Sequence, residues 1–117
     1  GMRHQKKKVT LDRKKGPRQA LLRNLVMSVI LYEKVRTTRA KAKAVEPLIN
    51  KFISLGKKNT LSAKRQLYSY FPIENPVKKI VEDLIKRYAD WPSGFTRIIK
   101  IGPRQGDAAE MVQIELV

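Results

Sequence analysis

The stretch Gly16–Lys34, GPRQALLRNLVMSVILYEK, is apolar around most of the circumference of a helix. Its leucine, valine and isoleucine side chains form one stripe at helical spacing, and further apolar residues widen that stripe onto the opposite side. Gly16 suits the N-cap and Pro17 the first helical position, where no backbone amide is needed. A helix this apolar has to be covered by other elements, so we expect it at the centre of the fold.

The segment directly before this helix is the most basic part of the chain. Residues 2–15, MRHQKKKVTLDRKK, hold seven Lys or Arg and a single acid, Asp12. With only Val9 and Leu11 to bury, the segment cannot offset the entropy lost on ordering. We therefore expect a basic, flexible arm over residues 1–15, which becomes ordered only on a partner, and a single domain over residues 16–117.

A short strand and a long helix are expected after the central helix, which should end near Lys34. Residues 35–38 are rich in β-branched side chains and predict a strand. The next helix is expected over residues 39–55, with Thr37 or Thr38 as its N-cap. Pro47 predicts a kink or a break in it, and Gly56 is suited to its C-terminal cap.

Two further helices precede a change of periodicity. Thr60 can cap a helix over residues 61–70, whose inward-facing side chains are expected to be Leu61, Leu67, Tyr68 and Phe71. Asn75 can cap the last helix, in which apolar residues recur at helical spacing from Val77 to Tyr88. Its outer face carries opposite charges four residues apart, which is typical of a solvated face with weak ion pairs.

The C-terminal residues alternate with the period of a strand. FTRIIKI (95–101) and EMVQIELV (110–117) flank a loop rich in Gly and Pro, which predicts a hairpin. In the first strand we expect Phe95, Arg97, Ile99 and Ile101 on one side. We expect Lys100 to be exposed, and Arg104, in the loop, to point to solvent or RNA.

These elements predict an α/β (α+β) fold in two layers. The order is helix, strand, three helices and a two-stranded hairpin. We expect residues 35–38 to pair with the hairpin, so that helices cover one face of a small three-stranded mixed sheet. The residues expected to be nearly fully buried are Leu25, Val29, Ile49, Ile80, Leu84 and Ile99.

Charge is distributed very unevenly along the 117 residues. The net charge is +16, and residues 1–66 hold 19 Lys or Arg against 3 Asp or Glu, whereas residues 67–117 hold 7 of each. Such asymmetry favours a polyanionic partner, either nucleic acid or an anionic membrane. The apolar run 25–32 is too short to span a bilayer and lacks a cleavage site for secretion, so we expect neither a membrane span nor a signal peptide. Of the two polyanions we expect nucleic acid, and no membrane, as the partner.

Residues for catalysis or for binding a metal or cofactor are scarce. The chain has no Cys, its only histidine is His4 in the arm, and it has no phosphate-binding glycine loop. Most carboxylates lie beside cations. We therefore expect no catalytic residues, no metal, no cofactor and no small-molecule substrate.

Cations are instead the candidate binding residues. Lysine and arginine neutralise phosphates and release counterions without reading sequence. Aromatic residues are spread out and are expected mostly on core faces, so a base-stacking platform is not predicted. The candidate RNA-binding residues are Arg3, His4, Lys6, Lys7, Lys8, Arg13, Lys14, Lys15, Arg18, Arg23, Arg36, Arg39, Lys41, Lys43, Lys57, Lys58, Arg97 and Arg104.

Several separate blocks of the chain carry a resemblance. They are Met2-Arg3-His4, LLRNL (21–25), EKVRTTRAKAK (33–43), GFTRIIK (94–100) and GDAAEMVQIELV (106–117). In order and spacing they are similar to the bacterial large-subunit ribosomal protein seventeen family, over essentially the whole chain. The resemblance implies a structural role on large-subunit ribosomal RNA in the cytoplasm, with neighbouring ribosomal proteins as partners.

Two function classes are left open by the residues alone. The first is a ribosomal structural protein, monomeric when isolated, whose arm enters folded RNA while its domain lies on the RNA surface. The alternative is a free-standing nucleic-acid-compacting or chaperoning protein, which could dimerise through the hairpin edge. An enzyme acting on nucleic acid is a third and weaker hypothesis, because the catalytic residue types are scarce.

Overall fold

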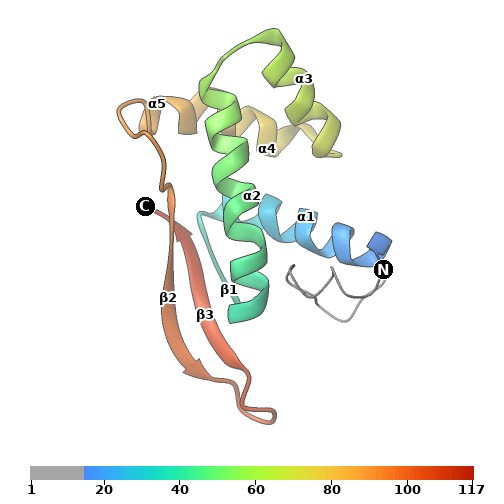
Figure 1. The fold of residues 1–117 in the computed structure, drawn as a ribbon, viewed down its shortest axis with the longest axis vertical. Coiled ribbons are helices and arrows are strands. Elements are labelled where there is room, and N and C mark those ends of the chain that lie inside the picture. The colour runs from blue at the N-terminus through green and yellow to red at the C-terminus, as the bar shows by residue number, and fades with distance from the viewer. Residues whose placement is uncertain (1–14) are drawn as a thin grey trace, which may run out of the picture.

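A computed structural model describes residues 15–117, and the rest of the predicted arm, up to Lys14, lies outside the described residues. The chain forms a helical layer against a small sheet (Figure 1). The elements are α1 (Lys15–Tyr32), β1 (Lys34–Thr38), α2 (Arg39–Lys57), α3 (Leu61–Tyr70), α4 (Glu74–Lys79), the π-helical turn η2 (Ile80–Leu84), α5 (Ile85–Arg87), β2 (Thr96–Pro103) and β3 (Glu110–Leu116).

The sheet has three strands in the order β1-β3-β2. The predicted pairing of β1 with the hairpin is confirmed, and the central strand β3 is its partner. Ile114 of β3 pairs with Val35 on one side and with Ile98 on the other. Both pairings are antiparallel, so the prediction of a mixed sheet is wrong: β3 runs opposite to both of its neighbours.

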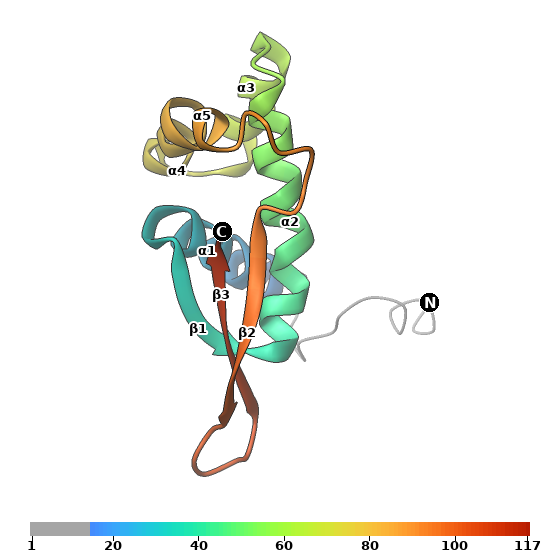
Figure 2. The same cartoon turned by 90° about the vertical axis from the view of Figure 1, so that its left-hand side faces the viewer.

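The helices lie on one face of the sheet, as predicted, and the other face is left uncovered (Figure 2). α1 and α2 pack against each other and against β3. α3, α4 and α5 gather at the end of α2 that is remote from the hairpin loop, and that loop extends beyond the helical layer (Figures 1 and 2). The two ends of the molecule therefore differ in thickness.

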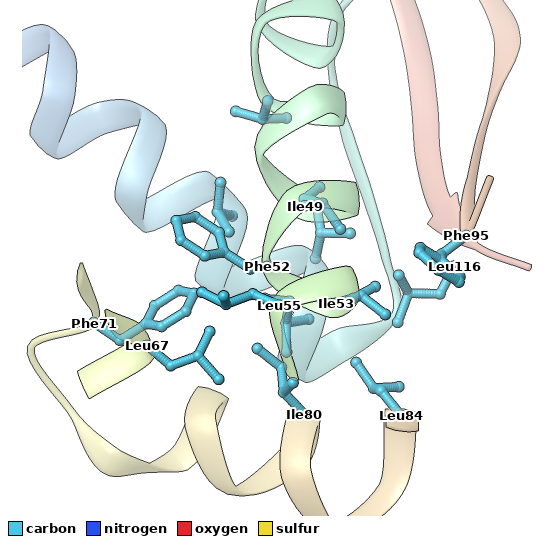
Figure 3. Close-up of a cluster of buried hydrophobic side chains, with 14 of the residues drawn as sticks. Ile49, Phe52, Ile53, Leu55, Leu67, Phe71, Ile80, Leu84, Phe95 and Leu116 are labelled. Atoms are coloured by element: carbon cyan, nitrogen blue, oxygen red, sulfur yellow. The ribbon is translucent and has the colours of Figure 1, made fainter. Parts of the chain in front are cut away.

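The core is centred on α1 and α2. Val29, Ile49, Ile80 and Leu84 are fully buried, as predicted. Aromatic and aliphatic side chains from α2, α3, η2 and the hairpin meet in one cluster (Figure 3). Leu25 is only half-buried at the margin of this cluster, so the prediction of its complete burial is wrong.

The sequence also predicted the wrong set of β2 side chains to face the helices. Ile99 and Ile101 are 41% and 45% exposed. Ile99 pairs with Gln113 on the uncovered face of the sheet, and Ile101 lies unpaired at the register shift between Lys100 and Gly102. Ile98, which pairs with the buried Ile114, is the residue that faces the helices. Phe95 is fully buried but precedes the strand, next to Gly94 with φ +73°, so its orientation does not set the alternation of β2. Lys100 is exposed, as predicted.

The predicted helix caps are confirmed at two threonines and are wrong at Gly56. The hydroxyls of Thr38 and Thr60 accept hydrogen bonds from the amides of Lys41 (3.4 Å) and Ala63 (3.1 Å), which confirms both caps. α2 continues through Pro47, so the helix is not broken there. Gly56 does not cap α2. It lies inside the helix, buried against Ile80, and a Cβ at this position would clash with the Ile80 side chain.

The last helices depart from prediction in four ways. Leu61 and Tyr68 of α3 are exposed, because the neighbouring helices contact only the face that bears Leu67. α4 begins at Glu74 rather than at an Asn75 cap, and the chain widens into the π-helical turn η2 directly before α5. Two cations on the outer face of this region also form ion pairs outside their own helix.

Candidate nucleic-acid interface

The predicted binding residues fall into two groups. Arg3, His4, Lys6, Lys7, Lys8, Arg13 and Lys14 lie outside the described residues, and of Lys15 only the backbone in the first turn of α1 is described. The other group comprises Arg18, Arg23, Arg36, Arg39, Lys41, Lys43, Lys57, Lys58, Arg97 and Arg104. Some of these cations pair with a carboxylate or carbonyl of the described chain, and the others do not.

Arg18, Arg23 and Lys43 are brought together by the packing of α1 on α2. They line a hollow of about 580 Å³ between these helices and the end of α3. Apolar side chains, among them Leu22 and Leu48, form the rest of its wall. Among the described residues that line this hollow there are three cations and no carboxylate, so this part of the chain gives the hollow a positive character.

Arg23 is held in a defined position within this wall. Its guanidinium carbon lies 5.8 Å from the centre of the Tyr70 ring, within cation–π range. The Nε of Arg23 is buried and has no hydrogen-bond partner among the described residues. A buried donor without a partner is costly, so this nitrogen is suited to an acceptor from a bound molecule.

Arg36 and Arg97 lie on the uncovered face of the sheet, where β1 and β2 flank β3. Arg97 donates two hydrogen bonds to Glu115, at 3.0 and 2.9 Å. Hydrogen bonds from Gln113 and then Arg97 lower the pKa of the Glu115 carboxyl. The Arg97 side chain is still 60% exposed, so a phosphate can reach it beside the carboxylate.

Three other predicted cations have partners inside the chain. Arg39 pairs with Glu110 at 3.4 Å, and Arg104, which is exposed as predicted, pairs with Asp107 at 2.5 Å. The hydrogen bond from Arg104 lowers the pKa of Asp107 to about 2. Lys57 donates a hydrogen bond to the carbonyl of Trp91 and lies 5.3 Å from the centre of the Phe95 ring, so it has a structural function in this fold.

Sequence reasoning missed Lys51 as a candidate and did not place Arg65 or Tyr70 in a site. Lys51 and Arg65 line a second hollow, of about 540 Å³, between α2 and α3. Tyr70 and Leu48 line both hollows, so the two are neighbours along α2. The spacing of the two cations in the sequence gives no signal of this, because the hollow forms only when α3 folds back onto α2.

Other kinds of site are not found in the described part of the chain. Among residues 15–117, no group of three or more His, Cys, Asp or Glu side chains is placed to hold a metal ion. None of the described helices combines the length and apolar character needed to cross a bilayer. This part of the chain therefore presents exposed cations and two hollows with apolar walls, and the ring of Tyr70 lines both hollows.

Comparison with known proteins agrees with the blocks of sequence described above. A family model described as "Ribosomal protein L17" matches residues 21–117. A protein of Dehalococcoides mccartyi, "Large ribosomal subunit protein bL17", is 44% identical over 116 residues, which is 99% of each chain. A protein of the same name from Desulfitobacterium hafniense is 47% identical over 107 residues, covering 92% of this chain and 96% of the relative.

Proposed function

This chain belongs to the ribosomal protein L17 family, and from that premise we propose that it binds the RNA of the large ribosomal subunit through its basic N-terminal segment and its exposed cations. Family membership itself gives the chain a structural role in the large subunit and places it on the ribosome. It is accordingly not an enzyme, as the sequence predicts.

The observation that carries the RNA-binding proposal is the distribution of charge. The excess of 19 cations over 3 acids in residues 1–66 accounts for the whole net charge of +16. Within residues 16–117, Arg18, Arg23, Arg36, Lys43 and Lys58 have no carboxylate within ion-pair distance. Cations left free by the fold are available to phosphates, and each phosphate contact releases condensed counterions.

The arm and the folded domain contribute differently in this proposal. The arm is proposed to contact RNA through its seven closely spaced lysines and arginines. The domain over residues 16–117 presents its cations on a surface of fixed shape. Contacts to phosphate position a protein without reading bases, so selection of the correct RNA depends on the shape of the folded site.

Neighbouring ribosomal proteins are the second class of partner. Strand β2 carries Ile99 and Ile101, both exposed, among charged residues. Exposed aliphatic side chains beside cations fit a mixed interface with protein and RNA. The isolated chain is proposed to be a monomer, and the alternative of a free-standing nucleic-acid-compacting protein is not supported by family membership.

Sedimentation tests this function directly. The tagged chain is expressed in a bacterium, and the lysate is separated on a sucrose gradient with and without ribonuclease. We expect the chain to sediment with the large subunit and to leave those fractions after the RNA is digested. Sedimentation with chromosomal DNA, or as free protein in an undigested lysate, would contradict the proposal.

A further inference from the structure

The two hollows on either side of Tyr70 form one groove along α2. Both are lined by Leu48 and Tyr70, and each has a volume within the range of about 300–1,000 Å³ typical of small-ligand sites. We call this surface the Tyr70 groove. It is defined by Arg18, Leu22, Arg23, Lys43, Leu48, Lys51, Arg65 and Tyr70.

The ring of Tyr70 is fixed in place and half-buried in the wall of the groove, with the Arg23 guanidinium carbon 5.8 Å from its centre. It packs against Phe52, with the ring centres 4.2 Å apart, and edge-on against Phe71 at 4.9 Å. Phe52 and Phe71 are themselves buried in the core. A ring that is already immobilised loses little conformational entropy when a flat ligand stacks on it.

The charges around the groove have one sign. Arg18, Arg23 and Lys43 line one hollow, Lys51 and Arg65 line the other, and among residues 16–117 no Asp or Glu lines either. The buried Nε of Arg23, which lacks a partner in residues 16–117, adds a donor that a bound acceptor would satisfy. Cations beside apolar walls and an aromatic ring are typical of sites for single-stranded nucleic acid.

We propose that the Tyr70 groove binds a short unpaired segment of ribosomal RNA, with a base packed against the Tyr70 ring and the Arg23 guanidinium, and its phosphates paired with Lys43, Lys51 and Arg65. This inference rests on the proposed function and specifies one site for it. A duplex does not fit, because its base faces are stacked inside the helix and cannot reach an aromatic ring. An apolar protein segment would leave five cations without counter-charges, so an anionic strand is favoured.

Cross-linking of the unaltered protein gives the first test. Large subunits that contain the full chain are irradiated with ultraviolet light, and the peptides cross-linked to RNA are identified by mass spectrometry. We expect a peptide that contains Tyr70, cross-linked to a nucleotide that is unpaired in the folded RNA. A cross-link from this peptide to a paired nucleotide or to another protein would overturn the inference, as would its absence when other peptides are cross-linked.

Aromatic variants of the full chain give the second test. Tyr70→Leu removes the ring, and Tyr70→Phe keeps it. Tyr68→Leu is the matched control, because Tyr68 lies on the same helix, is exposed, and does not line the groove. Affinity for large-subunit ribosomal RNA should fall roughly 5- to 150-fold with Tyr70→Leu, the loss of one base stack, and stay near wild type with the other two variants.

Charge variants separate the groove from general electrostatics. Arg65 lines the groove and its neighbour Lys64 does not. Arg65→Gln should reduce the slope of log affinity against log salt by about 0.7, one phosphate contact on a single strand, whereas Lys64→Gln should leave the slope unchanged. Thermal unfolding of each variant checks that the core is intact.

The outcomes distinguish this inference from the function on which it rests. Equal affinities for Tyr70→Leu and Tyr68→Leu, in a wild-type chain that binds the RNA and sediments with the large subunit, would overturn the groove alone. A wild-type chain that does not bind the RNA would overturn the proposed function, and the groove with it.

Discussion

Glu33, between α1 and β1, links this junction to Lys79 and Arg87 in the last helices. It lies between α1 and β1 with φ +68°, a left-handed conformation that is uncommon outside glycine. Its carboxylate accepts hydrogen bonds from Lys79 at 2.8 Å and from Arg87 at 2.6 and 2.9 Å. The sequence predicted ion pairs of these cations within their own helix, and the pair of Arg87 with Asp83 is confirmed at 3.0 Å. It did not predict Glu33 as their partner, because spacing along one helix cannot reveal a residue that lies 46 or 54 positions away.

This network predicts a dependence of stability on pH. Hydrogen bonds from Arg87 and then Lys79 lower the pKa of Glu33 from 4.5 to about 2. Between these values the unfolded state binds more protons, so the stabilisation is complete above about pH 4.5 and is lost as the pH falls towards 2. Because the side chain is 38% exposed, we expect Glu33→Gln to cost only about 1–2 kcal/mol at neutral pH.

Urea unfolding of wild type and Glu33→Gln at a series of pH values checks this prediction. The difference in free energy of unfolding should shrink as the pH falls from 4.5 to 2. The pKa of Asp107 is also lowered to about 2, but Asp107 is present in both proteins and cancels in the difference. A difference that does not change over this range would contradict the pKa assignment.

Gly56 gives a second prediction at the scale of one residue. Alanine is favoured over glycine inside a helix by about 1 kcal/mol, but here its Cβ would clash with the buried side chain of Ile80. Overpacking of a core typically costs about 1–3 kcal/mol, so we expect Gly56→Ala to lower the free energy of unfolding by about 1 kcal/mol in total. Gly16→Ala is the control in α1, because a Cβ added there would have no other atom within 4 Å; this variant should be neutral or stabilising. Urea unfolding of both variants measures the two effects, and a Gly56→Ala variant as stable as wild type would contradict the clash.

At the scale of elements, the sequence predicted the helices better than the faces of the strands. The apolar stripe of residues 16–34 and the threonine caps placed α1, α2 and α3, because these signals are local. The alternation from Phe95 to Ile101 did not give the inner face of β2, because Phe95 lies before the strand begins. The pairing of β2 with β3 decides at which residue the side chains begin to alternate between the two faces of the sheet. This pairing is a tertiary contact, which the local sequence does not reveal.

Two isoleucines of the sheet test which face is covered. Ile114 is fully buried beneath the helices, and Ile99 is 41% exposed on the other face. Ile114→Ala should lower the free energy of unfolding by about 2–5 kcal/mol, the usual cost of removing such a buried side chain, and Ile99→Ala by less than about 1 kcal/mol. Urea denaturation measures both, and equal losses would mean that Ile99 is also covered in the isolated protein.

The sequence identified some of the cations of the candidate site, but it did not predict how they are arranged in space. Arg18, Arg23 and Lys43 were identified as cations from the sequence, but their meeting around one hollow depends on the packing of α1 against α2. Tyr68, rather than Tyr70, was predicted to face inward, yet Tyr68 is exposed and the ring of Tyr70 packs against Phe52 and Phe71. The position of Tyr70 in the wall of the groove could not be predicted, since periodicity assigns a residue to a face of its helix but not to the edge of a tertiary hollow.

At the scale of the whole molecule, the charge distribution and the architecture complement each other. The cation-rich residues 1–66 include α1, β1 and α2, which build the centre of the fold, and the charge-balanced residues 67–117 complete the core and the sheet. The balanced half also carries the ion pairs of the hairpin, which reduce the charge that this end of the molecule presents. RNA binding is therefore expected to depend mainly on the N-terminal half.

A salt titration of RNA binding, with the full chain and with a chain that lacks residues 1–14, tests this account most directly. If the arm neutralises about five phosphates, its deletion should reduce the slope of log affinity against log salt by roughly 3.5–4.5. Because α1 begins at Lys15, the midpoint of urea unfolding should not change. An unchanged slope would remove the arm from RNA binding, and a collapsed unfolding midpoint would show that the arm belongs to the folded core.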